Sequence, residues 1–252
     1  MDSSTLTSRK MPIKDRRSEM IELNEFSKEI FTDDHGTTLP YRFYDPKLGE
    51  NRPLLVFLHG AGERGVENDR HLSVPVSPFV PEYEIDFEKY GAYYLVPQCA
   101  EEHQWVDTPW AEGSYDQTKV PISKHLYAAK ALIDEIVEKY KIDKSRIYIT
   151  GCSMGGFGTW DMITRFPGYF RAAMPICGGA DPRKAELIKD MPIWTFHGDA
   201  DLAVPVDGTR EMYHALKECG SDVIYTEIKG WGHHAWKFVN NAKCLYDWLF
   251  SR

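Results

Sequence analysis

A serine between two glycines is the feature of this sequence that points most directly to chemistry. Gly151-Cys152-Ser153-Met154-Gly155 follows a strand-like run at Arg146–Thr150 and precedes a helical pattern at Phe157–Phe166. This strand–turn–helix setting is the one that a G-x-S-x-G nucleophile elbow requires, because the tight turn presents the serine hydroxyl at its apex. The free N–H groups of the following helix favour negative charge there. We predict that Ser153 is a nucleophile; the alternative is a chance match to a short pattern.

A serine hydroxyl needs a base to remove its proton, and that base needs an acid to orient it. In an elbow enzyme the partners follow in the order serine, acid, histidine. Asp199 and Asp201 come after a strand-like run at Ile193–Phe196, and His233 and His234 come after another at Val223–Ile228. We predict Asp201 as the acid, with Asp199 accepting backbone N–H groups in its loop. His233, directly after Gly232, is the predicted base, and His234 is a neighbour that lines the site.

Acyl transfer also needs N–H donors for the oxygen that becomes negative. The backbone of Met154, next to the serine, is one predicted donor. The second is expected in the loop after the Leu54–Leu58 run, where His59-Gly60-Ala61-Gly62 stands. We predict Ala61 as this donor, with Gly62 as the next candidate, and expect His59 to brace the loop.

Alternating strand-like and helix-like segments must position these residues. Further strand-like runs lie at Ala92–Val96 and Ala172–Ile176, and apolar residues from Ile122 to Tyr140 recur at helical spacing. This alternation predicts an α/β fold, with a mainly parallel twisted sheet and helices on both faces. Two early strands, Phe26–Phe31 and Leu39–Tyr44, are expected to form an antiparallel N-terminal edge. Because sites of such sheets lie at the carboxyl ends of the strands, the candidate residues are expected to meet there.

Composition limits the classes of protein. The chain has 252 residues, 42% of them hydrophobic, and a formal net charge of −8, which disfavours nucleic-acid binding. Residues 1–20 are polar and are expected to form a flexible tail, followed by a single catalytic domain over 21–252. No apolar run is long enough to span a membrane and no signal peptide is evident, so we expect a cytoplasmic protein, or a secreted one if a signal has been removed. Five widely spaced cysteines indicate neither zinc nor a dithiol site, and one disulfide among them stays open.

These motifs together resemble the α/β-hydrolase fold serine esterases. The similarity is greatest to the carboxylesterase/predicted-peptidase branch, related to feruloyl-type esterases, dienelactone hydrolases and acyl-protein thioesterases. The matching segments are LLVFLHGAGERG at 54–65, VPQC at 96–99, RIYITGCSMGGFGTWDM at 146–162, PICGGADP at 175–182, PIWTFHGDADLAVPV at 192–206 and YTEIKGWGHHAW at 225–236. The resemblance implies a triad of Ser153, Asp201 and His233, with Ala61 and Met154 in the oxyanion hole. It also implies that no cofactor or metal is needed.

Two insertions, residues 63–90 and 101–121, are expected to shape the mouth of the site. Trp105, Trp231 and Trp236 could form an aromatic wall that, with His234, binds phenolic (feruloyl-type) esters. The alternative is that each tryptophan packs its own loop against the body of the protein.

We therefore expect a carboxylesterase that acts on small-molecule or polysaccharide-linked esters through an acyl-enzyme intermediate. A peptidase or thioesterase would use the same residues, and a non-catalytic binding protein could keep the scaffold. A metal site is a further alternative, built from His197, Asp199, Asp201, His233 and His234. The oligomeric state stays open.

Overall fold

The computed structural model describes residues 21–252, and the expected flexible tail at 1–20 lies outside the described residues. One eight-stranded sheet runs through them, in the order β1-β2-β4-β3-β5-β6-β7-β8. The strands are β1 (Ser27–Thr32), β2 (Thr38–Tyr44), β3 (Leu54–Leu58), β4 (Tyr93–Pro97), β5 (Ile147–Cys152), β6 (Ala172–Ile176), β7 (Trp194–Gly198) and β8 (Ile224–Ile228). β2 is antiparallel to β1 and β4, and every later pairing is parallel. The predicted α/β sheet with an antiparallel N-terminal edge is confirmed.

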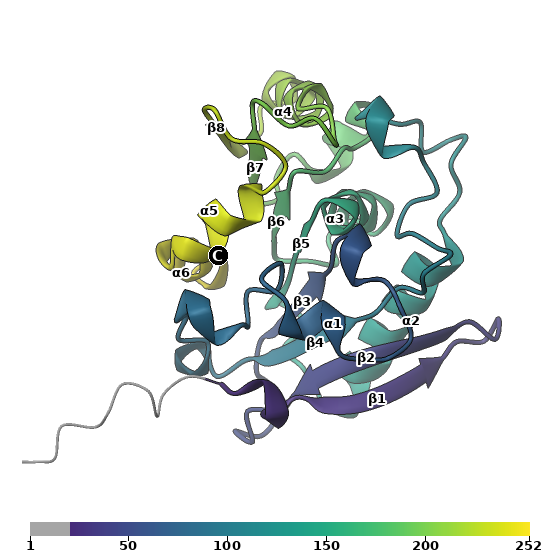
Figure 1. Cartoon of the computed structure of the whole chain (residues 1–252), viewed down its shortest axis with the longest axis vertical. Coiled ribbons are helices and arrows are strands. Elements are labelled where there is room, and N and C mark those ends of the chain that lie inside the picture. The colour runs from purple at the N-terminus through teal and green to yellow at the C-terminus, as the bar shows by residue number, and fades with distance from the viewer. Residues whose placement is uncertain (1–20) are drawn as a thin grey trace, which may run out of the picture.

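Helices cover both faces of this sheet (Figure 1). The α-helices are α1 (Arg70–Ser73), α2 (Lys124–Lys139), α3 (Met154–Arg165), α4 (Asp207–Glu218), α5 (Ala235–Asn241) and α6 (Cys244–Phe250). Short 3₁₀ helices occur at η2 (Leu23–Glu25), η3 (Ala61–Glu63), η4 (Pro81–Tyr83), η5 (Glu88–Tyr90), η6 (Trp110–Glu112) and η7 (Pro182–Ile188). Apolar residues of α2, α3 and α4 pack in one core layer, and those of α1, α5 and α6 pack in the other.

β3 is apolar throughout because it contributes to both layers. In β3, Leu54, Val56 and Leu58 pack on the α2–α3–α4 side, whereas Leu55 and Phe57 pack on the opposite side. Successive side chains of a strand point to opposite faces, so a strand buried on both faces has no polar alternation. This burial fixes the position of β3 and of the loop that follows it.

The helix predicted from the apolar pattern between Ile122 and Tyr140 begins two residues later than the pattern. Ser123 is its N-cap, and its hydroxyl accepts the Leu126 N–H at 3.1 Å. A capping serine satisfies a backbone donor that the first turn leaves free, so the helix starts at Lys124 and Ile122 lies before it. Among the described residues, no helix is both long enough and apolar enough to cross a membrane.

Candidate active site

Ser153 lies in a strained turn between β5 and α3. Its φ and ψ are 55° and −120°, a conformation that few side chains adopt. The turn forms because glycines let the backbone approach β3: a Cβ on Gly155 would lie 1.9 Å from the Leu58 carbonyl oxygen, and one on Gly151 would lie 2.5 Å from the Gly155 oxygen. The strand–turn–helix geometry predicted for the G-C-S-M-G segment is therefore present, with the serine at its apex.

Three residues that are far apart in the sequence meet beside this turn. The Ser153 Oγ lies 2.7 Å from His233 Nε2, and His233 Nδ1 lies 2.7 Å from Asp201 Oδ2. Asp201 follows β7 and His233 follows β8, so each side chain extends from the carboxyl end of a parallel strand. The structure thus brings the predicted nucleophile, base and acid into one hydrogen-bonded row.

The Asp201 carboxylate is held on both of its oxygens. Oδ1 accepts the backbone N–H groups of Ala203 at 2.8 Å and Val204 at 3.0 Å, while Oδ2 faces His233. Burial alone would raise the pKa of Asp201, but hydrogen bonds from His197, His233 and the Val204 amide outweigh it and lower the pKa below the ordinary value. Asp201 is therefore ionised throughout the neutral pH range.

Asp199, the alternative acid, has a different role. Its Oδ1 accepts the Gly230 backbone N–H at 2.6 Å, which ties the loop after β7 to the loop after β8. The Ala200 N–H donates to the Trp231 carbonyl at 2.9 Å and reinforces the same junction. Asp199 thus accepts a backbone N–H group, as predicted, and helps to position the loop that carries His233.

His197 also belongs to the site, and its contact with Asp201 was not predicted from the sequence. Its side chain is fully buried at the end of β7, and its Nε2 lies 3.2 Å from Asp201 Oδ2. In the sequence it was visible only as a possible metal ligand. The available signal was its place four residues before Asp201, near the end of a buried strand.

The loop after β3 lies against the serine turn. A Cβ placed on Gly60 would be 3.7 Å from the Ser153 Cβ, so the glycine before Ala61 lies beside the serine that precedes Met154. His59 braces this loop: its Nδ1 lies 2.6 Å from the Gly60 oxygen, and its Nε2 accepts the Cys99 N–H at 2.9 Å. Burial lowers the pKa of His59 to about 4, so the ring is neutral at ordinary pH.

Two charged residues complete this loop. Arg64 donates from Nε to the Ala61 oxygen at 2.9 Å and from Nη1 to the His103 oxygen at 3.3 Å, which braces the backbone. The Glu63 Oε2 is buried without a hydrogen-bond partner, and burial raises the pKa of this carboxyl group. Because its guanidinium is bound to two backbone carbonyl groups, Arg64 stabilises the loop after β3.

The expected aromatic wall is wrong for Trp105. This side chain is completely buried in the α2–α3–α4 core layer, and its indole N–H donates to the His59 oxygen at 3.1 Å. Trp105 therefore stabilises the loop after β3 and has no exposed surface that a ligand could contact. Its indole N–H finds a buried carbonyl, which is the usual requirement for burying a tryptophan.

The remaining predicted binding residues lie at the surface beside His233. Trp236 is half-buried and meets the His233 ring edge to face, with centroids 5.4 Å apart. His234 is exposed, and its ring centroid lies 5.1 Å from that of Trp236. Trp231 is 38% exposed and packs edge to face on Phe238. Trp236 therefore lies beside the predicted base and His234 beside Trp236, whereas Trp231 packs on α5.

The five-residue metal site is not assembled as expected. Among residues 21–252, the groups close enough to share an ion are Cys177, Asp201 and His233, a set that leaves out His197, Asp199 and His234. Burial raises the pKa of the Cys177 thiol, whereas a thiolate is the form that binds metal. The same atoms of Asp201 and His233 are already engaged with each other and with Ser153.

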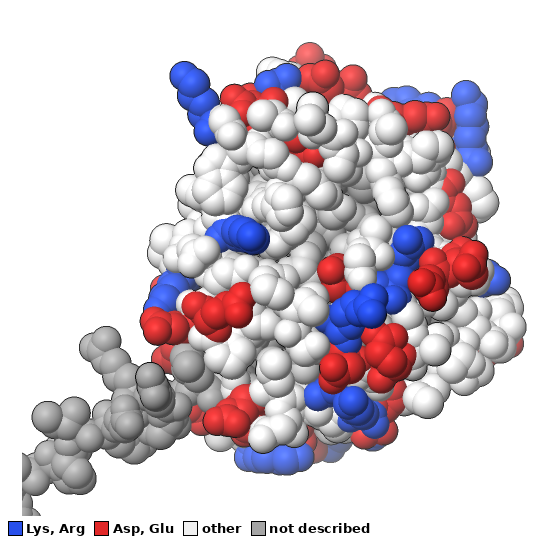
Figure 2. Space-filling model, viewed as in Figure 1, with Lys and Arg blue, Asp and Glu red and all other residues white. Residues whose placement is uncertain are grey.

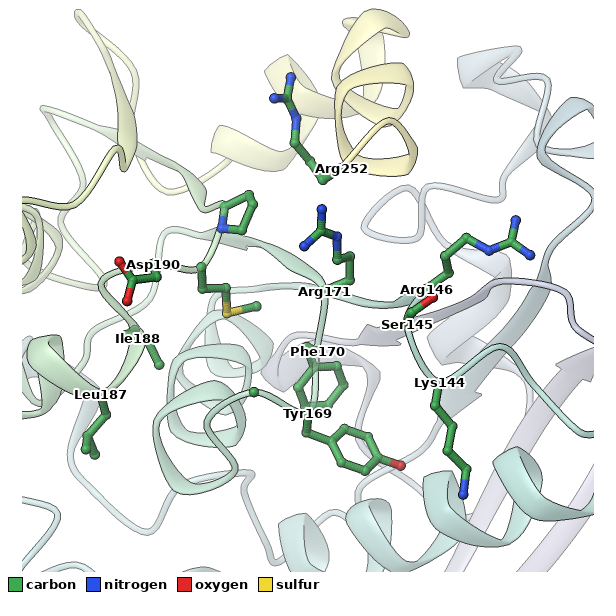
Figure 3. Close-up of a pocket in the computed structure, with 13 residues that line it drawn as sticks. Lys144, Ser145, Arg146, Tyr169, Phe170, Arg171, Leu187, Ile188, Asp190 and Arg252 are labelled. Atoms are coloured by element: carbon green, nitrogen blue, oxygen red, sulfur yellow. The ribbon is translucent and has the colours of Figure 1, made fainter.

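A hollow of about 620 Å³ lies at the opposite edge of the sheet, where β5 and β6 begin (Figure 3). It is lined in part by Lys144, Arg146, Arg171 and Arg252. Figure 3 shows Lys144 and Arg146 directed away from Arg171, so these basic groups do not converge on one point. This hollow is remote from Ser153, which lies at the carboxyl end of β5.

The chain is similar in sequence and in fold to known esterases. The family model described as phospholipase/carboxylesterase matches residues 45–242. A solved thermostable esterase is 36% identical, with a TM-score of 0.81, and the match covers 91% of this chain and 63% of that one. The putative esterase NocK of Nocardia uniformis subsp. tsuyamanensis is 25% identical over 179 residues, which are 69% of this chain and 48% of that protein. This chain therefore spans about half the length of that relative.

Peptidases share the fold as well. An acylaminoacyl peptidase of Pyrococcus horikoshii aligns over 90% of this chain and 42% of its own, with a TM-score of 0.67 and 17% identity. Identity at this level shows a common fold and nothing more about activity. The family match covers most of the described chain and includes the serine turn and the loops that carry Asp201 and His233. The chain belongs to the phospholipase/carboxylesterase family of α/β-hydrolases.

Proposed function

We propose that this protein hydrolyses carboxylic esters through an acyl-enzyme formed on Ser153, with His233 as general base and Asp201 as its orienting acid. The observation that supports this most strongly is the continuous row from Ser153 Oγ through His233 to Asp201 Oδ2, with both contacts at 2.7 Å. These distances lie within the range over which a base can take a proton from a nucleophile.

In the first half-reaction, Ser153 Oγ attacks the ester carbonyl carbon while its proton moves to His233 Nε2. The carbonyl oxygen becomes negative and accepts hydrogen bonds from the Ala61 and Met154 amides. The carbon–oxygen bond to the alcohol then breaks, and His233 returns its proton to the leaving alkoxide oxygen. An acyl group now occupies Ser153.

In the second half-reaction, water replaces the alcohol. His233 takes a proton from the water as its oxygen attacks the acyl carbon, and the same amides stabilise the second oxyanion. The bond between the acyl carbon and Ser153 Oγ breaks, and His233 returns the proton to that oxygen. The products are a free acid and the original enzyme.

The ionised Asp201 accepts the hydrogen on His233 Nδ1, so His233 Nε2 is left with a lone pair toward Ser153. It also stabilises the positive charge that His233 carries during each half-reaction. The buried carboxylate is suited to this because its position is set by two backbone amides as well as by the imidazole.

The surface beside the site favours an ester with an apolar or aromatic part. Leu202, which follows Asp201 in the chain, is fully exposed, and Trp231 and Phe238, which precede and follow His233 in the chain, are more than a third exposed. Figure 2 shows few charged residues on the part of this face where α5 lies in Figure 1. We propose that Trp231, Trp236 and His234 contact the substrate and that short acyl and phenolic (feruloyl-type) esters, free or linked to a polysaccharide, are accepted.

The test is Ser153→Ala measured with p-nitrophenyl butyrate. We expect kcat/KM to fall by about 10⁴-fold or more, because the nucleophile is lost, while the melting temperature stays close to that of the wild type. Wild-type turnover in the variant would refute the proposal. A panel of feruloyl esters, thioesters and peptide amides then ranks the substrates, and preference for the amide or the thioester would refute the carboxylesterase assignment.

A further inference from the structure

A second buried imidazole contacts the carboxylate of the proposed triad. His197 Nε2 lies 3.2 Å from Asp201 Oδ2, the same oxygen that His233 Nδ1 approaches at 2.7 Å. His197 and Asp201 both have side chains with no exposed surface. Two histidines therefore contact Asp201 Oδ2: His233, which also contacts Ser153, and His197, which is fully buried.

The hydrogen on His197 Nε2 is fixed by its surroundings. Besides Asp201 Oδ2, this nitrogen faces the Val204 carbonyl oxygen at 3.1 Å. Both neighbours are acceptors, and a lone pair on Nε2 would face two lone pairs in a buried place. Nε2 therefore carries a hydrogen and donates it to this pair of oxygens.

The other ring nitrogen anchors His197 to α4. Its Nδ1 lies 2.8 Å from the Thr209 hydroxyl, which in turn lies 3.0 Å from the Gly178 carbonyl oxygen. If the ring is neutral, Thr209 donates to Nδ1; if it is charged, Nδ1 donates to Thr209 and the hydroxyl donates to Gly178. Either arrangement holds the ring in one orientation, with Nε2–H toward Asp201.

We propose that His197 is a positioning residue that fixes the Asp201 carboxylate for His233, with Thr209 holding the His197 ring. The inference rests on the proposed ester-hydrolase mechanism. Oδ1 of Asp201 is fixed by two amides, and His197 supplies the second contact that fixes Oδ2. A displaced carboxylate would let His233 turn away from Ser153, and small displacements of reacting groups lower rates steeply.

Two substitutions separate the hydrogen bond from simple packing. His197→Gln keeps an N–H donor near the position of Nε2, whereas His197→Met fills similar space without a donor. We expect His197→Met to lower kcat for p-nitrophenyl butyrate by about tenfold or more with KM within about twofold, because the lost hydrogen bond is to a charged acceptor. His197→Gln is expected to recover most of this loss. Equal losses in both variants, or an unchanged kcat in His197→Met, would overturn the proposal.

A milder pair covers the case in which neither His197 variant folds. Thr209→Val removes the hydroxyl that holds Nδ1, and Thr195→Val is the matched control. Thr195 is also buried and donates to the Pro175 carbonyl at 3.0 Å, but its hydroxyl makes no hydrogen bond with His197. We expect kcat to fall in Thr209→Val and not in Thr195→Val; equal values would contradict the proposed anchoring.

A readout independent of turnover separates this inference from the proposed function. We expect the hydrogen between His233 Nδ1 and Asp201 Oδ2, which are 2.7 Å apart, to give a downfield proton resonance whose position depends on where the carboxylate lies. We expect it to shift or broaden in His197→Met and to stay in place in His197→Gln. If the wild type lacks Ser153-dependent turnover, the proposed function fails, whereas an unmoved resonance in His197→Met shows that the positioning role fails.

Discussion

Asp201→Asn is the substitution for which the structure predicts the most specific chemical defect. The amide oxygen of asparagine can replace Oδ1, which accepts the Ala203 and Val204 N–H groups at 2.8 and 3.0 Å. The amide nitrogen then replaces Oδ2, 2.7 Å from His233 Nδ1. An amide nitrogen only donates, so it forces Nδ1 to accept and moves the histidine hydrogen to Nε2. His233 then presents a hydrogen, rather than a lone pair, to Ser153.

The expected size of this defect follows from the loss of the base. A triad with the histidine in the wrong tautomer loses about 10⁴ in kcat, or about 5.5 kcal/mol of transition-state stabilisation. The substitution also removes the acceptor for His197, whose Nε2–H would face the asparagine nitrogen, another donor, 3.2 Å away. The fold is expected to survive, since the side chain keeps its size and its two backbone contacts.

The assay compares Asp201→Asn with Asp199→Asn, using kcat for p-nitrophenyl butyrate and the melting temperature of each variant. Asp199 is two residues away and accepts the Gly230 N–H at 2.6 Å, so asparagine can keep that bond through its carbonyl oxygen. We expect near wild-type kcat in Asp199→Asn. A kcat within tenfold of wild type in Asp201→Asn, or equal losses in the two variants, would refute the assignment of Asp201.

Two further predictions concern the scaffold. Gly155→Ala would place a Cβ 1.9 Å from the Leu58 carbonyl oxygen, so we expect a loss of several kcal/mol or no folded protein, whereas Gly62→Ala, whose Cβ would meet nothing within 4 Å, is expected to keep its melting temperature. Burial lowers the pKa of His125 to about 4, below the unfolded value near 6.5, so its unfolded form binds more protons and stability falls as the pH drops through this window. Urea titrations measure how much free energy of unfolding each protein loses between pH 7 and pH 5, and we expect this loss to be about 2 kcal/mol smaller in His125→Gln than in the wild type. Equal losses in the two proteins would show that His125 does not cause the pH dependence.

The parts of the site predicted from sequence depend on local motifs and on the geometry of a parallel sheet. The glycines on either side of Ser153 predict the tight turn, because a residue with a Cβ does not fit where backbone segments approach this closely. Asp201 and His233 each follow a strand, and the carboxyl ends of parallel strands share an edge. Their meeting with Ser153 could thus be expected without any contact being visible in the sequence.

Other features depend on side-chain packing that a sequence pattern does not contain. Trp105 follows a strand in an irregular segment, where an aromatic residue can line a site or support a loop, and the choice depends on the His59 carbonyl that accepts its N–H. The contact of His197 with Asp201 depends on the loop doubling back at Val204.

The most direct test of the central claim is to trap the acyl group during turnover. Wild-type enzyme mixed with p-nitrophenyl butyrate is quenched in acid, and its peptides are examined by mass spectrometry. We expect a butyryl group on the peptide that contains Ser153, and no such group in the Ser153→Ala variant. Steady turnover with no acyl group on Ser153, or with the acyl group on another residue, would contradict the proposed mechanism.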